Sequence, residues 1–208
     1  MNLPQRADQM TPESRLAERQ FAIAKKMLRD VAVTLENGNV WYCLDGTTLL
    51  GLMSESRLPP RDGTMNLFVT EQESHRVTAL TWKFRSLGYS ASVRKHREDW
   101  PPFKKGDVRG VEIRKRKHLF STGPVQLEIL IKYRQGDNLY WTEGPQHQNV
   151  KKCVPTKYFK LITSTEFEGH KYWIPATYDE YLTFRYQNWR TWGKERNPIT
   201  GDSATVTD

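Results

Sequence analysis

A short apolar run that stops at a glycine constrains the fold of this 208-residue chain more than any other feature. The run spans residues 40–44, has the pattern of a buried strand, and breaks at Asp45-Gly46. Residues 47–53 then show the spacing of a short helix. A strand that passes through a glycine turn into a helix is typical of folds that layer helices on a sheet. We therefore expect an α/β (α+β) fold.

A long helix is predicted ahead of this unit. Thr11-Pro12 resembles a helix start, because threonine can cap the first turn and proline fits the first helical position. Apolar residues then recur every three or four positions up to Asn37-Gly38, where glycine can take the left-handed cap conformation. We expect this stripe to be buried against the sheet or against a partner, including a second copy of the chain. Its members are Ala17, Phe21, Ala24, Leu28, Val31 and Leu35.

Further strand and helix patterns follow along the chain. A turn at residues 59–63 leads into a second strand at residues 65–69, which we expect to lie beside the first. Residues 77–87 keep a helical period. The remaining predicted elements are strands at residues 89–93, 108–114 and 125–133, a hairpin at residues 167–175 and a helix at residues 178–188.

No linker and no internal repeat divides the sequence. We expect an N-terminal extension over residues 1–11 and one domain over residues 12–197. Residues 198–208 are rich in Thr, Ser, Gly and Asp, so we expect a flexible tail there.

Charge and cysteine content limit the kinds of binding partner and the cellular compartment that we expect for this chain. The chain has 32 Lys and Arg against 24 Asp and Glu, a net charge of +8 that favours phosphates, nucleic acid or an acidic protein surface. Basic residues concentrate in residues 92–117, with Trp100 and Phe103 among them as stacking surfaces. This stretch is therefore either a solvated strand and loop or a polyanion-binding patch. Cys43 and Cys153 have the pattern of free thiols in a reducing compartment. Because we find neither a signal peptide nor a run of ~18 apolar residues, we expect a cytoplasmic protein without a membrane span.

The strand–turn–helix unit offers a site for a phosphate. Gly46, Thr47 and Thr48 would place unpaired backbone N–H groups, a hydroxyl and the positive end of the helix dipole beside it. Carboxylates at alternate positions of the neighbouring strand would point to the same side and hold Mg²⁺ against that phosphate. Simple helix capping also accounts for the Gly-Thr-Thr step, so both interpretations stay open.

Residues 41–51 resemble the LicD and fukutin family, in which a strand is followed by Gly-Gly-Thr-Leu-Leu-Gly. This chain ends the same run with Gly-Thr-Thr-Leu-Leu-Gly. The offset that holds the family's Pro-Trp-Asp-Asp-Asp-Ile-Asp string holds Pro-Arg-Asp-Gly-Thr-Met-Asn at residues 60–66 here. A glycine hairpin, a proline and a Tyr-Asp-Glu-Tyr-Leu helix at residues 166–182 are similar to the family's closing pattern. The resemblance covers residues 35–189 in fragments.

The resemblance implies a nucleotidyltransferase fold, a short mixed sheet flanked by helices. It also implies a reaction that moves phosphocholine or a phospho-alditol from a CDP-linked donor to a glycan. In that chemistry an Asp-x-Asp pair and a third acid hold the metal, which neutralises the diphosphate. Glu128 is the candidate third acid. The alternative interpretation is that Glu128 is an ordinary strand residue whose side chain faces outward. The implied roles are catalytic for Asp45, Asp62 and Glu128, cofactor-binding for Gly46, Thr47, Thr48 and Arg61, and metal-binding for Asp62, Thr64, Asn66 and Glu128.

This chain departs from the family at the positions that carry the chemistry. Thr64 and Asn66 stand where the family has its two carboxylates, and neutral oxygens are poorer Mg²⁺ ligands. Arg61 replaces the family's tryptophan and could contact a phosphate directly in place of a cation. Ser54 stands where an arginine commonly follows the Leu-Leu-Gly step.

Three functions are consistent with these residues. The leading one is a LicD-like protein whose metal-dependent transfer is weakened or lost, and which serves as a binding or structural module. The alternative is an active phosphotransferase that uses a CDP-linked or other nucleotide donor, with Asp45, Asp62 and Glu128 as a rearranged metal site. The third is a nucleic-acid-binding domain, which rests only on residues 92–117.

Overall fold

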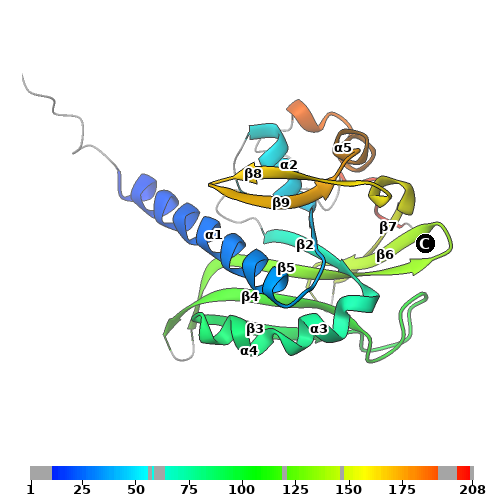
Figure 1. Cartoon of the computed structure of the whole chain (residues 1–208), viewed down its shortest axis with the longest axis horizontal. Helices are drawn as coiled ribbons and strands as arrows, with labels where there is room; N and C mark the ends of the chain where they lie inside the picture. The colour runs from blue at the N-terminus through cyan, green and yellow to red at the C-terminus, as the bar shows by residue number, and fades with distance from the viewer. Residues whose placement is uncertain are drawn as a thin grey trace, which may run out of the picture.

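A mixed sheet forms the centre of the molecule. The computed structural model describes residues 11–55, 58, 64–118, 121–145, 148–191 and 201–206 (Figure 1). β2 and β5 are parallel, and the other neighbouring strands of this sheet are antiparallel. The predicted short mixed sheet is therefore confirmed. Its main path runs β1 (Cys43–Asp45), β2 (Thr64–Thr70), β5 (Ser121–Gln135), β4 (Val108–His118) and β3 (Tyr89–Lys95), while β6 (Asn138–Glu143) pairs with β5 and with β7 (Val150–Pro155).

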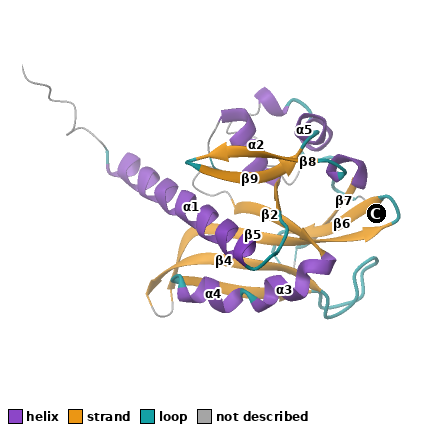
Figure 2. Ribbon diagram, viewed as in Figure 1, coloured by secondary structure: helices purple, strands orange, loops and turns teal. Residues whose placement is uncertain are grey.

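Helices flank this sheet, as Figure 2 shows. α1, α3 and α4 lie across one face, whereas α2 and α5 group with a separate two-stranded hairpin near β1 and β2. The helices are α1 (Pro12–Asn37), α2 (Gly46–Glu55), α3 (Ser74–Ala79), α4 (Thr81–Ser86) and α5 (Tyr178–Tyr186), the short 3-10 helices are η1 (Glu71–Glu73), η2 (Thr156–Phe159) and η3 (Trp189–Thr191), and the hairpin is β8 (Ile162–Phe167) with β9 (His170–Pro175).

The predicted elements are present, with three differences. Residues 40–42 are not part of β1, although the predicted neighbourhood of the first two strands is confirmed by the pairing of Cys43 with Phe68. The helix expected at residues 77–87 is two short helices that meet at Leu80. β6 and β7 were not predicted. Two consecutive lysines in β7 indicate an exposed segment, yet Lys152 is fully buried.

The apolar stripe of α1 is buried only in its second half. Thr11 accepts a hydrogen bond from the Ser14 backbone N–H at 3.2 Å, which confirms the predicted cap. Leu28, with its neighbours on the stripe toward the end of the helix, is fully buried, but Phe21 is half-buried and Ala17 is exposed. A 26-residue helix is roughly 39 Å long, and its first half extends beyond the sheet in Figure 1. The expected partner on this half stays a prediction.

We expect Leu28→Ala to lower the free energy of unfolding by about 3 kcal/mol, because it leaves a cavity in a packed core. Phe21→Ala should cost less than half as much, since the Phe21 ring already contacts solvent. Urea denaturation of the two variants compares the losses directly. Equal losses would contradict the structure and would mean that the first half of α1 is covered in solution.

Residues 201–206 are anchored. Asp202 is 4% exposed and Ala204 is 2% exposed, so the expectation of a flexible tail is wrong for these residues. The reason is electrostatic, because the Asp202 carboxylate pairs with the buried cations Arg185 and Lys152. Among the residues that the structure describes, no helix has the length and apolarity needed to span a membrane.

Candidate functional site

The two faces of the sheet differ in chemistry. On the face under α1, α3 and α4, alternate residues such as Val111, Leu127 and Leu67 are fully buried and apolar. The side chains between them point the other way. Phe68 and Leu130 of this second set are buried and apolar, but toward the start of β2 the set is polar. We use the name polar face for these members of the set: Thr64, Asn66, Ser90, Ser92, Arg94, Glu112, Arg114, Gln126 and Glu128.

The start of α2 packs on β2 at the edge of the polar face. Gly46 has a φ of +51°, and a Cβ there would lie 3.1 Å from Asn66 Oδ1, so both the backbone and the space favour glycine. The Thr47 hydroxyl donates to Thr64 O at 2.7 Å and to Asn66 Oδ1 at 3.2 Å. Thr48 Oγ1 accepts the Asn66 N–H at 2.6 Å. The structure therefore brings together these five predicted site residues, and it uses both threonine hydroxyls to fasten α2 to β2.

Glu128 lies in the same row of the sheet. Its Cα pairs in register with those of Asn66 on β2 and Glu112 on β4. Only 7% of Glu128 is exposed, so it is a buried group and not an outward-facing one. Burial raises its pKa to about 7, although the Arg109 guanidinium, with Nη2 3.8 Å from Oε1, acts in the opposite direction. Glu128 can therefore exchange a proton near neutral pH.

Asp45 does not reach the polar face as a free carboxylate. It is fully buried, with Oδ2 2.7 Å from Lys132 Nζ and Oδ1 3.3 Å from Arg185 Nη1, and the Tyr181 hydroxyl donates to Oδ1. Burial alone would raise the pKa of Asp45, but the positive charges of Lys132 and Arg185 outweigh it and hold the pKa below its ordinary value. The catalytic role implied for Asp45 does not suit this position, because every contact of the carboxylate is with a group of the core.

Lys132 sits in an aromatic box beside Asp45. Burial lowers the pKa of Lys132, and the Asp45 carboxylate opposes that shift. Sequence reasoning missed this residue, although a lysine inside the apolar strand pattern at residues 125–133 is a usable signal. The Nζ atom lies over the rings of Phe68 at 4.1 Å, Trp141 at 4.1 Å, Phe159 at 4.8 Å and Tyr181 at 5.6 Å.

The described residues do not fit a divalent metal. Among them, no three His, Cys, Asp or Glu side chains come close enough together to hold one. Asn66 Oδ1 already lies within hydrogen-bond distance of the Thr47 hydroxyl. Of the two predicted acids in register with Asn66, Asp45 is already paired with Lys132 and Arg185, which leaves Glu128. Arg61 and Asp62 lie outside the described residues. A dication held by two neutral oxygens and one carboxylate of raised pKa would be bound weakly.

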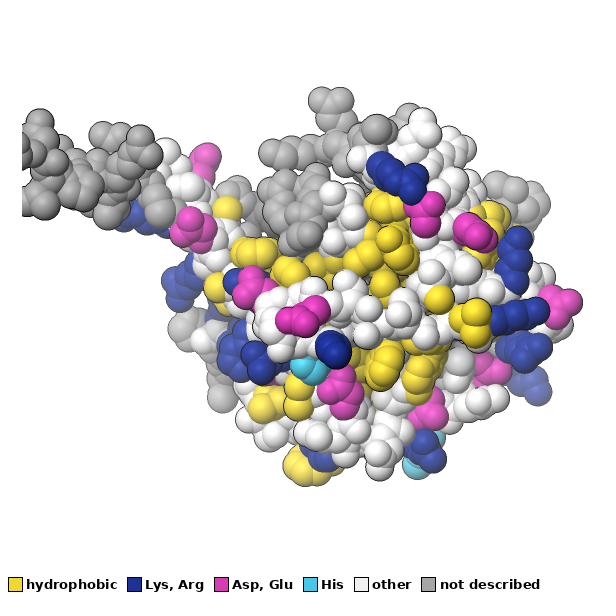
Figure 3. All heavy atoms as spheres, turned by 45° about the horizontal axis from the view of Figure 1, so that its top comes forward, with side chains coloured by type: hydrophobic (Ala, Val, Ile, Leu, Met, Phe, Trp, Pro, Cys, Tyr) yellow, Lys and Arg dark blue, Asp and Glu magenta, His cyan; other side chains and the backbone are white. Residues whose placement is uncertain are grey.

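The basic stretch at residues 92–117 is not one continuous patch. Glu112 pairs with Arg94 and with Arg114 Nε at 3.1 Å, so part of the positive charge is neutralised on the polar face. The exposed cations of the loop before β4 and those at the end of β4 are separated by a strand of 11 residues, roughly 35 Å. Figure 3 shows the basic side chains of the whole molecule on one face, where they form separate groups with acidic side chains among them.

The two aromatic residues of this stretch have different surroundings. Phe103 is 1% exposed and stacks on His96 with ring centroids 4.3 Å apart, so it is a core residue and not a stacking surface. Burial lowers the pKa of His96 to about 4, with the Arg109 charge adding to the effect. Trp100 is half-buried and has Lys151 Nζ 4.6 Å from its ring centroid. Polyanion binding stays a prediction for the exposed cations.

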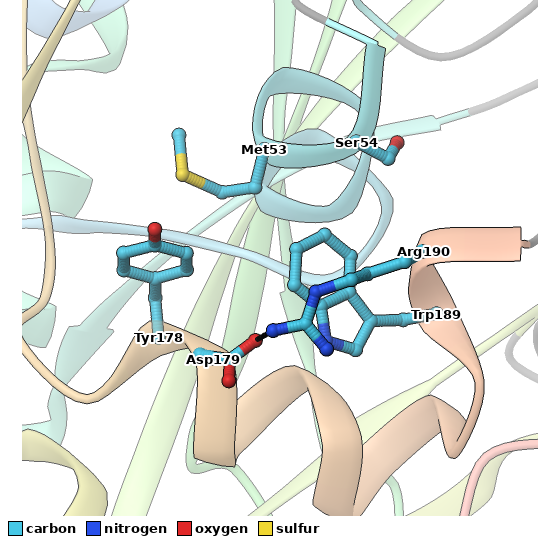
Figure 4. A pocket seen from close by; sticks show the side chains of 6 residues that line it. All are labelled: Met53, Ser54, Tyr178, Asp179, Trp189 and Arg190. Atoms are coloured by element: carbon cyan, nitrogen blue, oxygen red, sulfur yellow. Dashed lines mark hydrogen bonds and ion pairs between the residues drawn. The ribbon is translucent and has the colours of Figure 1, made fainter.

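A pocket of about 300 Å³ lies between the end of α2, the start of α5 and η3 (Figure 4). Asp179 and Arg190 form an ion pair at its wall. Ser54, which replaces the arginine common in the resembled family, also lines it, and its hydroxyl donates to Leu50 O at 2.7 Å. Arg190 therefore supplies a guanidinium to the pocket from a different part of the chain. The other lining residues are Met53, Tyr178 and Trp189.

Glu128→Gln should change how stability depends on pH. The folded chain holds the Glu128 proton more tightly than the unfolded chain, because burial raises the pKa from 4.5 to about 7. The contribution of this group to stability therefore falls as pH rises through that interval. Between about pH 5 and about pH 8, the natural chain should lose about 2 kcal/mol more than the glutamine variant does.

Urea denaturation at the two pH values measures this difference. Glu98→Gln, at an exposed position, is the matched control and should follow the natural chain. Parallel losses in the natural chain and in Glu128→Gln would show that the Glu128 carboxyl is solvated.

Comparison with known proteins gives one family and one structural neighbour to report. The model of the LicD/FKTN/FKRP nucleotidyltransferase domain matches residues 39–177. Among solved structures, the crystal structure of ANT(2")-Ia in complex with adenylyl-2"-tobramycin is similar with a TM-score of 0.34 and 11% sequence identity. The match covers 58% of this chain and 56% of that chain, so this chain spans little more than half of that protein. No curated protein matches this chain.

Proposed function

Because the chain belongs to the LicD/FKTN/FKRP nucleotidyltransferase family, we propose that it binds a phosphate-bearing ligand and has weakened or lost metal-dependent transfer. The proposed ligand class is a CDP-linked donor or another nucleotide. Its phosphate would lie at the Gly46–Thr48 turn, where α2 begins beside β2. The positive end of the α2 dipole favours an anion at this position.

One observation supports the proposed loss of metal-dependent chemistry. Thr64 and Asn66 present a hydroxyl and an amide at the start of β2, where the family has two carboxylates. Neither side chain supplies the negative charge that keeps a dication bound. The polar face instead carries guanidinium groups, of which Arg114 extends toward β5 and donates to the Gln126 amide oxygen. A cationic side chain can stabilise phosphate charge without a metal.

The active-enzyme alternative has less support from the geometry. It needs Asp45, Asp62 and Glu128 as a rearranged metal site. The Asp45 carboxylate is enclosed by Lys132 and Arg185. That leaves Glu128 and Asp62 for the metal, and Asp62 lies outside the described residues. The nucleic-acid alternative is weakened because the basic stretch is divided and partly ion-paired.

Calorimetry and a turnover assay test the proposal together. The natural chain is titrated with CDP-choline, with a CDP-alditol and with Mg²⁺ alone, and each donor is repeated in the presence of EDTA. We expect donor binding that EDTA does not change, no Mg²⁺ binding and no turnover. Thr47→Val should weaken donor binding because it removes the hydroxyl that holds the start of α2 against β2, while Ser86→Ala, an exposed position on α4, is the control. Magnesium-dependent turnover that Glu128→Ala or Asp62→Ala abolishes would establish the active enzyme instead.

A further inference from the structure

Residues 201–206 pack against the β7 edge of the sheet. The Cys153 N–H donates to Ala204 O at 2.7 Å, and the Val206 N–H donates to Lys151 O at 2.9 Å. On its other side, the Ser203 N–H donates to Arg185 O of α5 at 2.8 Å. The segment thus lies between β7 and α5. It is a turn and not a full strand, because the Thr205 N–H donates to Asp202 O at 3.0 Å and only Thr205 forms a β-bridge, with Lys152 of β7.

Alternate side chains of this segment point into the protein. Asp202 and Ala204 are buried, whereas Gly201 and Ser203 are exposed. Thr205 Oγ1 accepts a hydrogen bond from Lys152 Nζ at 2.7 Å. The rest of the protein therefore contacts an acidic side chain at position 202, a small side chain at position 204 and a hydroxyl at position 205.

The acidic position carries the electrostatic part of this recognition. The Asp202 carboxylate accepts from Arg185 Nε at 3.1 Å and also contacts Arg185 Nη2. Its Oδ2 atom lies 3.1 Å from Lys152 Nζ. Arg185 would keep Asp45 and Glu143 as partners, but Lys152 is fully buried and Asp202 is its one carboxylate partner among the described residues. An occupant without a negative charge would therefore leave the Lys152 ammonium poorly compensated.

Residues 201–206 make few contacts for a segment that would have to bind without a covalent link. Three backbone hydrogen bonds and two buried side chains hold these described residues to β7 and α5. A peptide of this size binds weakly when free, and its covalent link raises its effective concentration at the site to about the millimolar range. Occupancy therefore depends on the tether as well as on the contacts.

We propose that the β7 edge, together with Arg185, is a docking site for a short acidic turn, and that residues 201–206 are its tethered occupant. A partner protein fits this site when it presents an Asp-x-Ala-Thr turn. Arg185 also contacts Asp45, so the occupant shares a cation with the residue that precedes α2. The proposal is independent of the phosphate-binding function.

Peptide exchange tests this proposal. A protease recognition sequence is inserted after Pro198 of the full chain, which is purified folded and then cut. A fluorescent peptide with the sequence of residues 201–206 is added, and anisotropy reports its binding. We expect the cut chain to release its own segment and bind the labelled peptide, while the uncut chain binds at least tenfold less.

Two further peptides separate this site from nonspecific binding. An Asp202→Asn peptide should bind at least tenfold more weakly, because it lacks the charge that compensates buried Lys152 and pairs with Arg185. A Ser203→Ala peptide changes an exposed side chain and should bind as the natural one does. A cut chain that unfolds, or that retains its segment and excludes the labelled peptide, would show a fixed part of the fold. Equal binding of the asparagine and natural peptides would also overturn the proposal.

Discussion

Replacing Asp45 by asparagine will lower the free energy of unfolding by about 3–5 kcal/mol, a large share of the stability of an ordinary domain. Asparagine keeps the shape of the side chain and removes its charge. Arg185 would retain Asp202 and Glu143 as partners, but Lys132 would lose its only carboxylate contact among the described residues. Lys132 is fully buried, so solvent cannot compensate the charge.

Urea denaturation followed by circular dichroism measures this loss. Asp179→Asn is the matched control, because Asp179 pairs with Arg190 at an exposed position and should change stability by less than about 1 kcal/mol. In the double variant Asp45→Asn with Lys132→Met, the buried cation and anion leave together, so part of the loss should return. A single-variant loss no larger than that of Asp179→Asn would show that the ion pairs do not hold this region.

The pH dependence gives an independent check on Asp45. Its pKa is lowered from 3.8 in the folded chain, so the carboxylate contributes stability above its unfolded pKa. That contribution is lost as pH falls below about 4 and through the folded pKa. The natural chain should therefore lose stability in this acid range more steeply than Asp45→Asn does.

Local patterns in the sequence predicted much of the fold. The apolar run before Gly46 and the strand at residues 65–69 are neighbours, as expected, and the glycine adopts the positive φ that a break of this kind uses. The cap at Thr11 is likewise a contact between residues three positions apart. Such features depend on nearest neighbours in the chain, so hydropathy and turn chemistry are sufficient to find them.

The buried charges could not be predicted in this way. Arg185 and Asp45 are 140 positions apart and meet only in the tertiary fold. Each supplies the opposite charge that allows the other to be buried. Lys152 gives β7 a polar pattern, although its charge is neutralised by Asp202. Hydropathy alone assigns such residues to the surface, which explains the missed strand and the expected flexible tail.

The candidate site was predicted in position but not in pairing. The resemblance places Gly46, Thr47 and Thr48 beside Thr64 and Asn66, and the structure does bring them together. It could not reveal that the threonine hydroxyls are engaged with β2. It also could not reveal that the Asp45 carboxylate points into a cage of cations.

Restoring both family carboxylates, with Thr64→Asp and Asn66→Asp in one variant, should create magnesium binding, which we propose that the natural chain lacks. The two side chains are two positions apart on β2 and share a face, and Asn66 is in register with Glu128. The Asn66→Asp change would keep an oxygen within reach of the Thr47 hydroxyl, because Asn66 Oδ1 already lies 3.2 Å from it. Two new negative charges should bring the dissociation constant for Mg²⁺ to the order of 1 mM or tighter.

Calorimetry with Mg²⁺ measures this gain, and thermal denaturation gives a second readout. Without metal, the new carboxylates repel each other and Glu128, so the variant should unfold at a lower temperature than the natural chain. Added Mg²⁺ should raise that temperature in the variant only, because a ligand that binds the folded state stabilises it. The neutral variant Thr64→Asn is the control for side-chain size, and it should neither bind Mg²⁺ nor respond to it. A folded double variant that still fails to bind Mg²⁺ would mean that the site lacks the geometry as well as the charges for the metal, and that Thr64 and Asn66 are not the sole cause of the proposed loss of metal chemistry.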